Sequence, residues 1–446
     1  MLFRSQSVDG TDLSYYLLAY DADSKERQDH PAGLISERIL DALDSEPVTD
    51  VFLFSHGWRG DVPAAREQYQ GWLQAMAKCE SDRASIRKKR PGFRPLLIGL
   101  HWPSEHWGEE DLSKEVSFAP GAEVADEIDP VSAYATRLGD SPQVREALKV
   151  IIEADRSAGV SDSMPEKVIA AYRALDKAVG LPKSGPDAAP GADWQVFDPE
   201  AIYEAAKADS PVMESVSFGL PGRGSFLGPL RVLSFWKMKD RARQFGERGV
   251  HPFLVAMQSL TAGRDVRYHL AGHSFGCIVA SSALAGPVDA GTTPDQVDSL
   301  VLLQGALSLW SYCKQVPAGS GKPGYFHRII ARQQVRGSIV TTQSRYDTAV
   351  GTWYPRAAWS AGQVEFSVEA NLPTYGAVGA YGIQGTGLSP EELAMKSLGE
   401  SYDFRAGGIY NIEGSGYIKD GRGFSGAHSD IRKPEVAHAV WSAVIG

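Results

Sequence analysis

The chain of 446 residues is 43% hydrophobic and 22% charged, a balance typical of folded globular proteins rather than of disordered or fibrous chains. Its formal net charge of −10 disfavours nucleic-acid binding, because an acidic surface repels a phosphate backbone. Three scattered cysteines, Cys79, Cys277 and Cys313, exclude a disulfide framework and favour a reducing compartment. The start of the chain lacks the apolar stretch of a secretory signal, and no run reaches the roughly 20 apolar residues of a membrane span. We therefore expect a cytoplasmic protein without a transmembrane segment.

Six short apolar runs predict β-strands, at residues 49–55, 96–100, 266–271, 299–304, 338–343 and 408–412. Because they are apolar almost throughout, they are typical of parallel strands buried on both faces, and the segments between them leave room for crossover helices. The sequence predicts an α/β fold with a doubly wound, mostly parallel sheet.

Helical spacing is clear after residue 61, where apolar residues recur on one face, and from Pro434 to the end of the chain. The basic residues between 83 and 94 predict a solvated connector between a helix and a strand.

Residues 104–228 differ from the rest, with 23 acidic and 11 basic residues and thus a net charge of −12. Ser141-Pro142 and Asp198-Pro199 are helix-start signals, each followed by helical spacing. We expect a mainly helical insertion in a core of residues 1–103 and 229–446. The insertion is either a lid or cap over the sheet end or an acidic excursion without a substrate role. A second excursion, 353–405, is rich in Gly, Tyr and Ala, and its role stays unassigned.

The segment Gly272-His273-Ser274-Phe275-Gly276 follows a predicted strand directly and precedes a helix of small residues. A serine on such a sharp turn is forced into a strained backbone conformation, and the flanking glycines remove Cβ atoms that would clash. The following helix directs its first N–H groups at charge developing beside the serine. The alternative is an ordinary glycine-rich turn that happens to hold a serine.

In this context the sequence resembles the α/β-hydrolase superfamily, whose nucleophile elbow has this form and position. The stretch from Thr49 to Trp58 also resembles a group of microbial α/β-hydrolases with a His-Gly-Trp loop. The resemblance covers residues 49–103, about 230–350 and 408–446. It implies that Ser274 is a nucleophile and that an acid and then a histidine follow it along the chain.

Three histidines follow Ser274. His438 lies within the last helix and His327 precedes a predicted strand, whereas His428 lies in the loop before the last helix, where the family keeps its base. We expect His428 to be that base.

Asp347 is the leading acid, since it ends a strand-to-turn segment that resembles the acid position after the family's penultimate strand. The alternative position after the preceding strand holds Gln304-Gly305-Ala306, which offers no carboxylate. The remaining rivals are Asp403, Asp420 and Asp430.

Acyl transfer also needs N–H donors aimed at the oxyanion. We expect the backbone of Phe275 to provide one, and the loop resemblance implies the backbone of Trp58 as the other. His56 then holds the loop, with a catalytic role as the alternative. The Trp58 indole, Trp102 and His273 are candidate substrate-binding residues, and the two tryptophans fit a core position equally well.

These residues predict a serine hydrolase that cleaves a small-molecule or lipid-like carboxylic ester through an acyl-enzyme, without a metal or organic cofactor. A non-catalytic binding protein of the same fold, and an acyltransferase or amidase using the same triad, remain alternatives. The sequence gives no oligomeric state.

Overall fold

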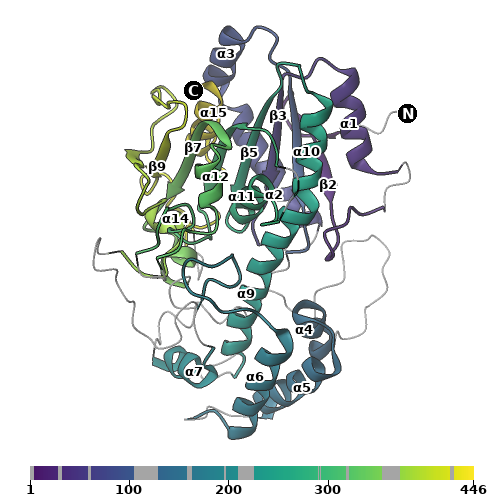
Figure 1. Ribbon diagram of the computed structural model, residues 1–446, viewed down its shortest axis with the longest axis vertical. Helices are drawn as coiled ribbons and strands as arrows, with labels where there is room; N and C mark the ends of the chain where they lie inside the picture. Colours follow the sequence, from purple (N-terminus) through teal and green to yellow (C-terminus); the bar gives the residue numbers. More distant parts are fainter. Residues whose placement is uncertain are drawn as a thin grey trace.

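The computed structural model of the protein describes residues 5–28, 33–58, 62–104, 129–157, 163–194, 197–208, 226–289, 291, 293–317, 321–353, 372–421 and 426–446. A single sheet runs through the upper part of the molecule in Figure 1, and a group of helices lies below it.

The sheet has nine strands in the order β1-β2-β4-β3-β5-β6-β7-β9-β8. Only β1 pairs antiparallel with its neighbour, and all other pairs are parallel. The strands are β1 Gln6–Ser7, β2 Ser14–Ala19, β3 Asp50–Ser55, β4 Pro95–His101, β5 Arg267–His273, β6 Val297–Leu303, β7 Val335–Gln343, β8 Glu391–Ala394 and β9 Ile409–Glu413. The central strand β3 is buried along its whole length, as expected when helices cover both faces.

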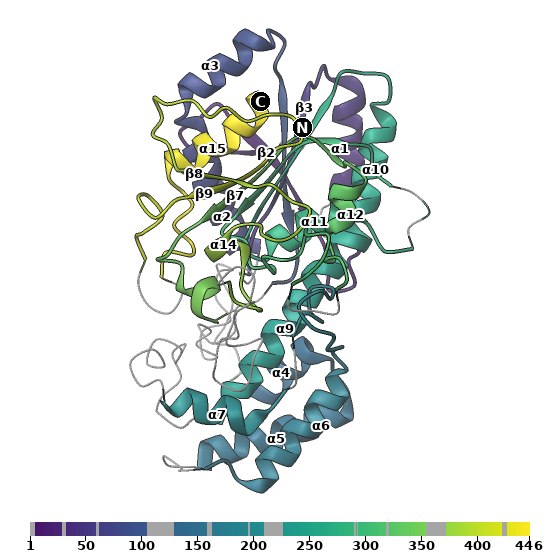
Figure 2. The ribbon, with the colours of Figure 1, turned by 60° about the vertical axis from the view of Figure 1, so that its left-hand side comes forward.

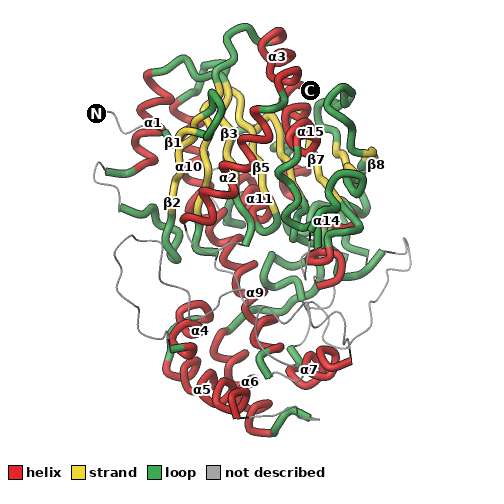
Figure 3. The backbone as a smooth tube through the Cα atoms, turned by 180° about the vertical axis from the view of Figure 1, so that it is seen from behind, coloured by secondary structure: helices red, strands yellow, loops and turns green. Residues whose placement is uncertain are grey.

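Helices cover both faces of the sheet (Figures 2 and 3). One face carries α1 Ile35–Ser45, α10 His251–Leu260, α11 Gly276–Ala285 and α12 His327–Ala331, and the other carries α2 Val62–Ala77, α3 Glu80–Lys89 and α15 Pro434–Ile445. Two apolar cores result, one under each helical layer. The predicted α/β class with a mostly parallel sheet is confirmed.

The described part of the insertion is helical and forms an apolar core of its own. Its helices are α4 Pro130–Leu138, α5 Pro142–Ser157, α6 Glu166–Val179 and α7 Pro199–Ala208. They pack on the first half of α9 Gly228–Phe245, through Leu230, Leu233 and Trp236 among others. Residues 105–128 and 209–225 of the insertion lie outside the described residues.

A continuous helical rod joins this insertion to the sheet layers (Figure 1). From α9 the chain passes through the π-helical turn η1 Gly246–Val250 into α10. The widened turn lies where Gly246 packs against α11, since a Cβ there would lie 2.6 Å from the Val279 carbonyl oxygen. A buried ion pair between Lys239 of α9 and Asp193 fixes the loop between α6 and α7 to this rod.

The sequence missed several elements. Strands β1, β2 and β8 and helix α1 were not predicted. Helix α14 Val378–Tyr381 lies within the second excursion, the short π-helical turn η2 Ala349–Trp353 ends at its first residue, and residues 354–371 are outside the described part. The expected solvated connector is wrong for residues 83–89, which belong to α3. That helix places three basic residues in its last turn, where they interact favourably with the helix dipole.

Candidate active site

The turn between β5 and α11 holds Ser274 in a left-handed backbone conformation, with φ of +56°. Both flanking glycines are sterically required there. A Cβ on Gly272 would lie 2.3 Å from the carbonyl oxygen of Gly276, and a Cβ on Gly276 would lie 2.1 Å from that of Ser55. Such a strained residue persists only where its surroundings hold it, and strain of this kind clusters at functional sites.

The neighbouring loop after β6 holds the serine backbone from both sides. The Ser274 N–H donates to the Leu303 carbonyl at 3.1 Å, and the Ala306 N–H donates to the Ser274 carbonyl at 3.2 Å. The turn that carries Ser274 is thereby fixed to the segment that follows the adjacent strand.

Three side chains distant in sequence form one hydrogen-bonded line. The distance from Ser274 Oγ to His428 Nε2 is 2.7 Å, and that from His428 Nδ1 to Asp347 Oδ2 is 2.8 Å. A carboxylate only accepts hydrogen bonds, so Nδ1 carries the proton and, in the neutral ring, Nε2 accepts from the Ser274 hydroxyl. The Asp347 side chain is fully buried, the His428 ring is 12% exposed and Ser274 is 6% exposed. In this arrangement the basic ring nitrogen of His428 faces the Ser274 hydroxyl, in a site that is largely shielded from solvent.

The carboxylate of Asp347 has further partners. Its Oδ2 also accepts from Gln304 Nε2 at 2.8 Å, and its Oδ1 accepts from the Val350 N–H at 3.2 Å. The turn after β7 is also bonded to the loop that carries the histidine, because the Ala427 N–H donates to the Tyr346 carbonyl at 2.8 Å.

The rival acids are engaged elsewhere. Asp403 is near Arg405, whereas Asp420 and Asp430 both pair with Lys433 and hold the loop after β9. The other two histidines also bond away from Ser274: His327 contacts the Tyr312 carbonyl, and His438 bridges Asp82 and the Glu400 carbonyl. The structure therefore brings Ser274, His428 and Asp347 together from the candidates that the sequence offered.

The loop after β3 lies directly against Ser274. A Cβ on Gly57 would lie 2.7 Å from Ser274 Cβ. The Gly57 carbonyl accepts from His56 Nδ1 at 2.7 Å and from Ser104 Oγ at 3.1 Å, and because a trans peptide points its N–H opposite to its C=O, these bonds set the direction of the Trp58 N–H.

The second candidate donor is the Phe275 N–H, at the N-cap of α11. Among the backbone hydrogen bonds of the described residues, this N–H donates none. It lies at a helix N-terminus, where N–H groups point outward at a positive dipole end.

His56 bonds the loop after β3 and is itself held by a second histidine. His101 Nδ1 donates to His56 Nε2 at 3.2 Å, so the proton of His56 is on Nδ1, which donates to Gly57. Burial lowers the pKa of His101 to about 4, and the cations Arg27 and Arg66 add to the effect, so His101 is neutral at pH 7. The expectation that His56 holds this loop agrees with its contacts.

Two of the candidate substrate-binding residues are internal, which corrects their assignment. Trp102 is 0% exposed, stacks on His56 and donates from its indole N–H to the His56 carbonyl at 3.3 Å, so it belongs to the core. His273 is also buried. Gln68 Nε2 donates to His273 Nδ1 at 3.1 Å, and His273 Nε2 donates to the His428 carbonyl at 2.8 Å. His273 therefore holds the loop that carries His428 instead of facing a substrate.

Trp58 remains partly exposed beside the nucleophile. Its ring stacks on Phe275 with centroids 5.7 Å apart and meets Phe235 of α9 at 6.1 Å. Phe235 is partly buried and was not predicted, since nothing in the sequence places α9 at this edge of the sheet.

A second Ser-His-Asp array lies inside the sheet. His269 Nδ1 is 2.9 Å from Ser299 Oγ, and its Nε2 is 3.2 Å from Asp50 Oδ1. Asp50 is also paired with Arg90 at 2.6 Å, and all three members of the array are at most 3% exposed. No substrate reaches this array, so we assign it a structural role.

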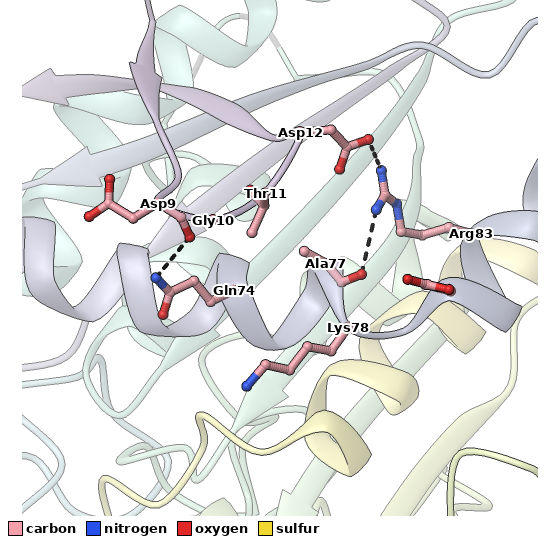
Figure 4. Close-up of a pocket in the computed structure, with 9 residues that line it drawn as sticks. Asp9, Gly10, Thr11, Asp12, Gln74, Ala77, Lys78 and Arg83 are labelled. Carbon is pink, nitrogen blue, oxygen red and sulfur yellow. Dashed lines mark hydrogen bonds and ion pairs between the residues drawn. The ribbon is translucent and has the colours of Figure 1, made fainter.

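A surface hollow of about 530 Å³ lies far from Ser274, between the β1–β2 turn and the end of α2 (Figure 4). Its lining is mostly exposed and mixed in charge, and Arg83 pairs with Asp12 across one side. It contains neither a histidine nor a cysteine, and it is not the candidate active site.

Neither a family model, nor a curated protein, nor a solved structure was found to match this chain. Within the described residues, no cluster of three or more His, Cys, Asp or Glu side chains is arranged to hold a metal ion, and no helix is long and apolar enough to cross a membrane.

Proposed function

We propose that the protein is a serine hydrolase of the α/β-hydrolase type that cleaves a carboxylic ester. The single observation that carries this proposal is the line from Ser274 Oγ through the His428 ring to Asp347, with distances of 2.7 and 2.8 Å. Two features match that fold: the serine lies on a strand-to-helix turn, as in its nucleophile elbow, and the triad follows the chain order Ser, Asp, His.

In the proposed reaction the Ser274 oxygen attacks the ester carbonyl while His428 Nε2 accepts the hydroxyl proton. His428 then gives this proton to the departing alcohol, and an acyl-enzyme on Ser274 is left. Water, activated by the same histidine, attacks the acyl carbon and releases the acid and the free serine. Asp347 keeps the proton on Nδ1 and stabilises the imidazolium that forms in each step.

The oxyanion that develops on the ester carbonyl is stabilised by the N–H of Phe275 and that of Trp58. Phe275 is supported by its place at the N-cap of α11. Trp58 is supported by the two hydrogen bonds to the Gly57 carbonyl, which fix the orientation of the Gly57–Trp58 peptide. Donors that are fixed before the reaction need no reorganisation when charge develops, which is the source of their effect.

The aromatic side chains of Trp58, Phe235 and Phe275 support an ester with an apolar group. These rings lie within about 6 Å of one another, centroid to centroid, and Phe275 directly follows the nucleophile. Apolar and aromatic walls with a few polar groups are typical of small-molecule sites.

The test is hydrolysis of p-nitrophenyl esters of increasing chain length by the wild type and by Ser274→Ala. We expect the wild type to turn over these esters and the variant to lose about 10⁴-fold or more in kcat while its fold is retained. Equal turnover by both proteins would refute the proposal.

A further inference from the structure

We infer that Gln304 is a positioning residue of the catalytic machinery: its side-chain amide holds the Asp347 carboxylate, and its backbone belongs to the loop that holds Ser274. This inference rests on the proposed function, and it names a residue for which the sequence indicated no role beyond the absence of a carboxylate.

The contact is direct and fully buried. Gln304 Nε2 donates to Asp347 Oδ2 at 2.8 Å, the same oxygen that accepts from His428 Nδ1. Gln304 is 0% exposed and Asp347 is 1% exposed, so water does not compete for this bond. A charge-assisted hydrogen bond in such surroundings is stronger than one between neutral groups in water.

The amide is itself oriented by Thr342 of β7. Thr342 Oγ1 donates to Gln304 Oε1 at 3.0 Å and accepts from the Gln304 N–H at 3.0 Å. This pair of bonds fixes which end of the amide faces Asp347, so the NH₂ group is directed at the carboxylate.

The backbone of Gln304 is strained, which indicates that its conformation is imposed. Its φ is +46°, a left-handed value that a buried non-glycine residue rarely adopts. The segment around Gly379 packs closely against this backbone, because a Cβ on Gly379 would lie 2.6 Å from the Gln304 carbonyl carbon.

The same short loop holds the nucleophile. Leu303 accepts from the Ser274 N–H and Ala306 donates to the Ser274 carbonyl, so residues 303–306 contact both ends of the triad. Gln304 therefore couples the position of the acid to that of the serine, and its loss lets the carboxylate move relative to His428.

The first test compares Gln304→Met with a matched control, Gln334→Met. Gln334 is also a buried glutamine whose Nε2 bonds a carbonyl, that of Leu284, at the opposite end of β7. We expect kcat for a p-nitrophenyl ester to fall about 10- to 100-fold in Gln304→Met with little change in KM, because displacement of a catalytic group lowers the rate this much. The control should keep the wild-type kcat.

The second test uses the same two variants and needs no turnover. Gln304 Nε2 and the proton on His428 Nδ1 both bind one oxygen, Asp347 Oδ2. We expect the ¹H NMR resonance of this Nδ1 proton to move in Gln304→Met, because the carboxylate is no longer held against the ring, and to keep its wild-type position in Gln334→Met.

An unmoved His428 Nδ1 proton resonance, or wild-type kcat, in a folded Gln304→Met would overturn the inference. If the wild type hydrolyses no ester and reacts with no fluorophosphonate, the proposed function fails instead, while the NMR resonance still tests the contact of Gln304 with the pair. Folding of each variant is checked by its thermal unfolding.

Discussion

A methyl group added at Gly57 tests how closely the loop after β3 is packed against the nucleophile. In Gly57→Ala the new Cβ would lie 2.7 Å from Ser274 Cβ and 3.1 Å from both Nδ1 and the carbonyl oxygen of His273, whereas ordinary contacts are 3.4–4 Å. The two segments must separate by at least about 0.7 Å. Ser274 is held by Leu303 and Ala306, so we expect the Gly57–Trp58 peptide to move.

The expected cost follows from this displacement. A misplacement of about 1 Å, or the loss of one oxyanion donor, each lowers the rate about 100-fold, which corresponds to about 2.7 kcal/mol in activation free energy. The overpacking costs about 1–3 kcal/mol of unfolding free energy. We therefore expect kcat to fall about 100-fold while KM changes little and the protein stays folded.

The assay is steady-state hydrolysis of a p-nitrophenyl ester, with thermal unfolding as the check on the fold. Gly228→Ala is the matched control, because a Cβ there meets nothing within 4 Å. A folded Gly57→Ala variant with kcat within about threefold of the wild type would refute the placement of this loop against Ser274.

Three further substitutions test separate parts of the structure. Asp347→Asn should lower kcat about 10⁴-fold in ester kinetics, because the amide no longer keeps the base in its working tautomer, and a fall below tenfold would contradict the assigned acid. The pKa of His101 is lowered from 6.5 to about 4 by burial, so the unfolded chain binds the proton first, and the wild type should lose about 3 kcal/mol of unfolding free energy between pH 6.5 and 4. In denaturant unfolding, His101→Asn should not show this loss between pH 6.5 and 4. If the unfolding free energy falls equally with pH in both proteins, His101 does not titrate as described. Lys239→Met removes the buried cation that faces the Asp193 carboxylate and should cost about 3–5 kcal/mol in the same assay, with recovery in the double variant Lys239→Met/Asp193→Leu and no recovery if the pair is not coupled.

The central strands could be predicted because burial on both faces leaves a plain apolar signature. All six predicted runs are strands, and β3 is apolar on four of its six residues. Two of the missed strands lack this signature: β8 is a four-residue edge strand with two glutamates, and β1 has two residues. Such edge strands form because the adjacent strand offers backbone hydrogen bonds, and the residues of the edge strand themselves give little indication of this pairing. Strand β2 was missed although five of its six residues are apolar.

Chain order and position after a strand were enough to nominate Ser274, Asp347 and His428. The roles of Gln304 and Gln68 were not predicted, because each depends on which loop lies beside it in space. A signal was present for Gln304, which directly follows a buried strand at the edge where Ser274 and Asp347 also lie. His273 and Trp102 are buried, which their positions did not predict. His273 is next to Ser274 in the sequence and Trp102 follows a strand at the carboxyl edge of the sheet, and neither position reveals whether a side chain faces the core or a substrate.

The presence of two Ser-His-Asp arrays shows why these residue types alone do not define a site. Ser299 has its histidine at 2.9 Å, yet it lies inside the sheet, without a strained turn or a helix N-terminus beside it. Ser274, unlike Ser299, lies on a strained turn beside the N-terminus of a helix. A measurement of which of the two serines is reactive therefore tests the claim about the triad.

That measurement is labelling with a fluorophosphonate, followed by peptide mass spectrometry. The account predicts rapid modification of Ser274 alone, loss of labelling in Ser274→Ala and His428→Ala, and unchanged labelling in Ser299→Ala. A protein that stays unlabelled, or that carries the label at a serine other than 274, would contradict it.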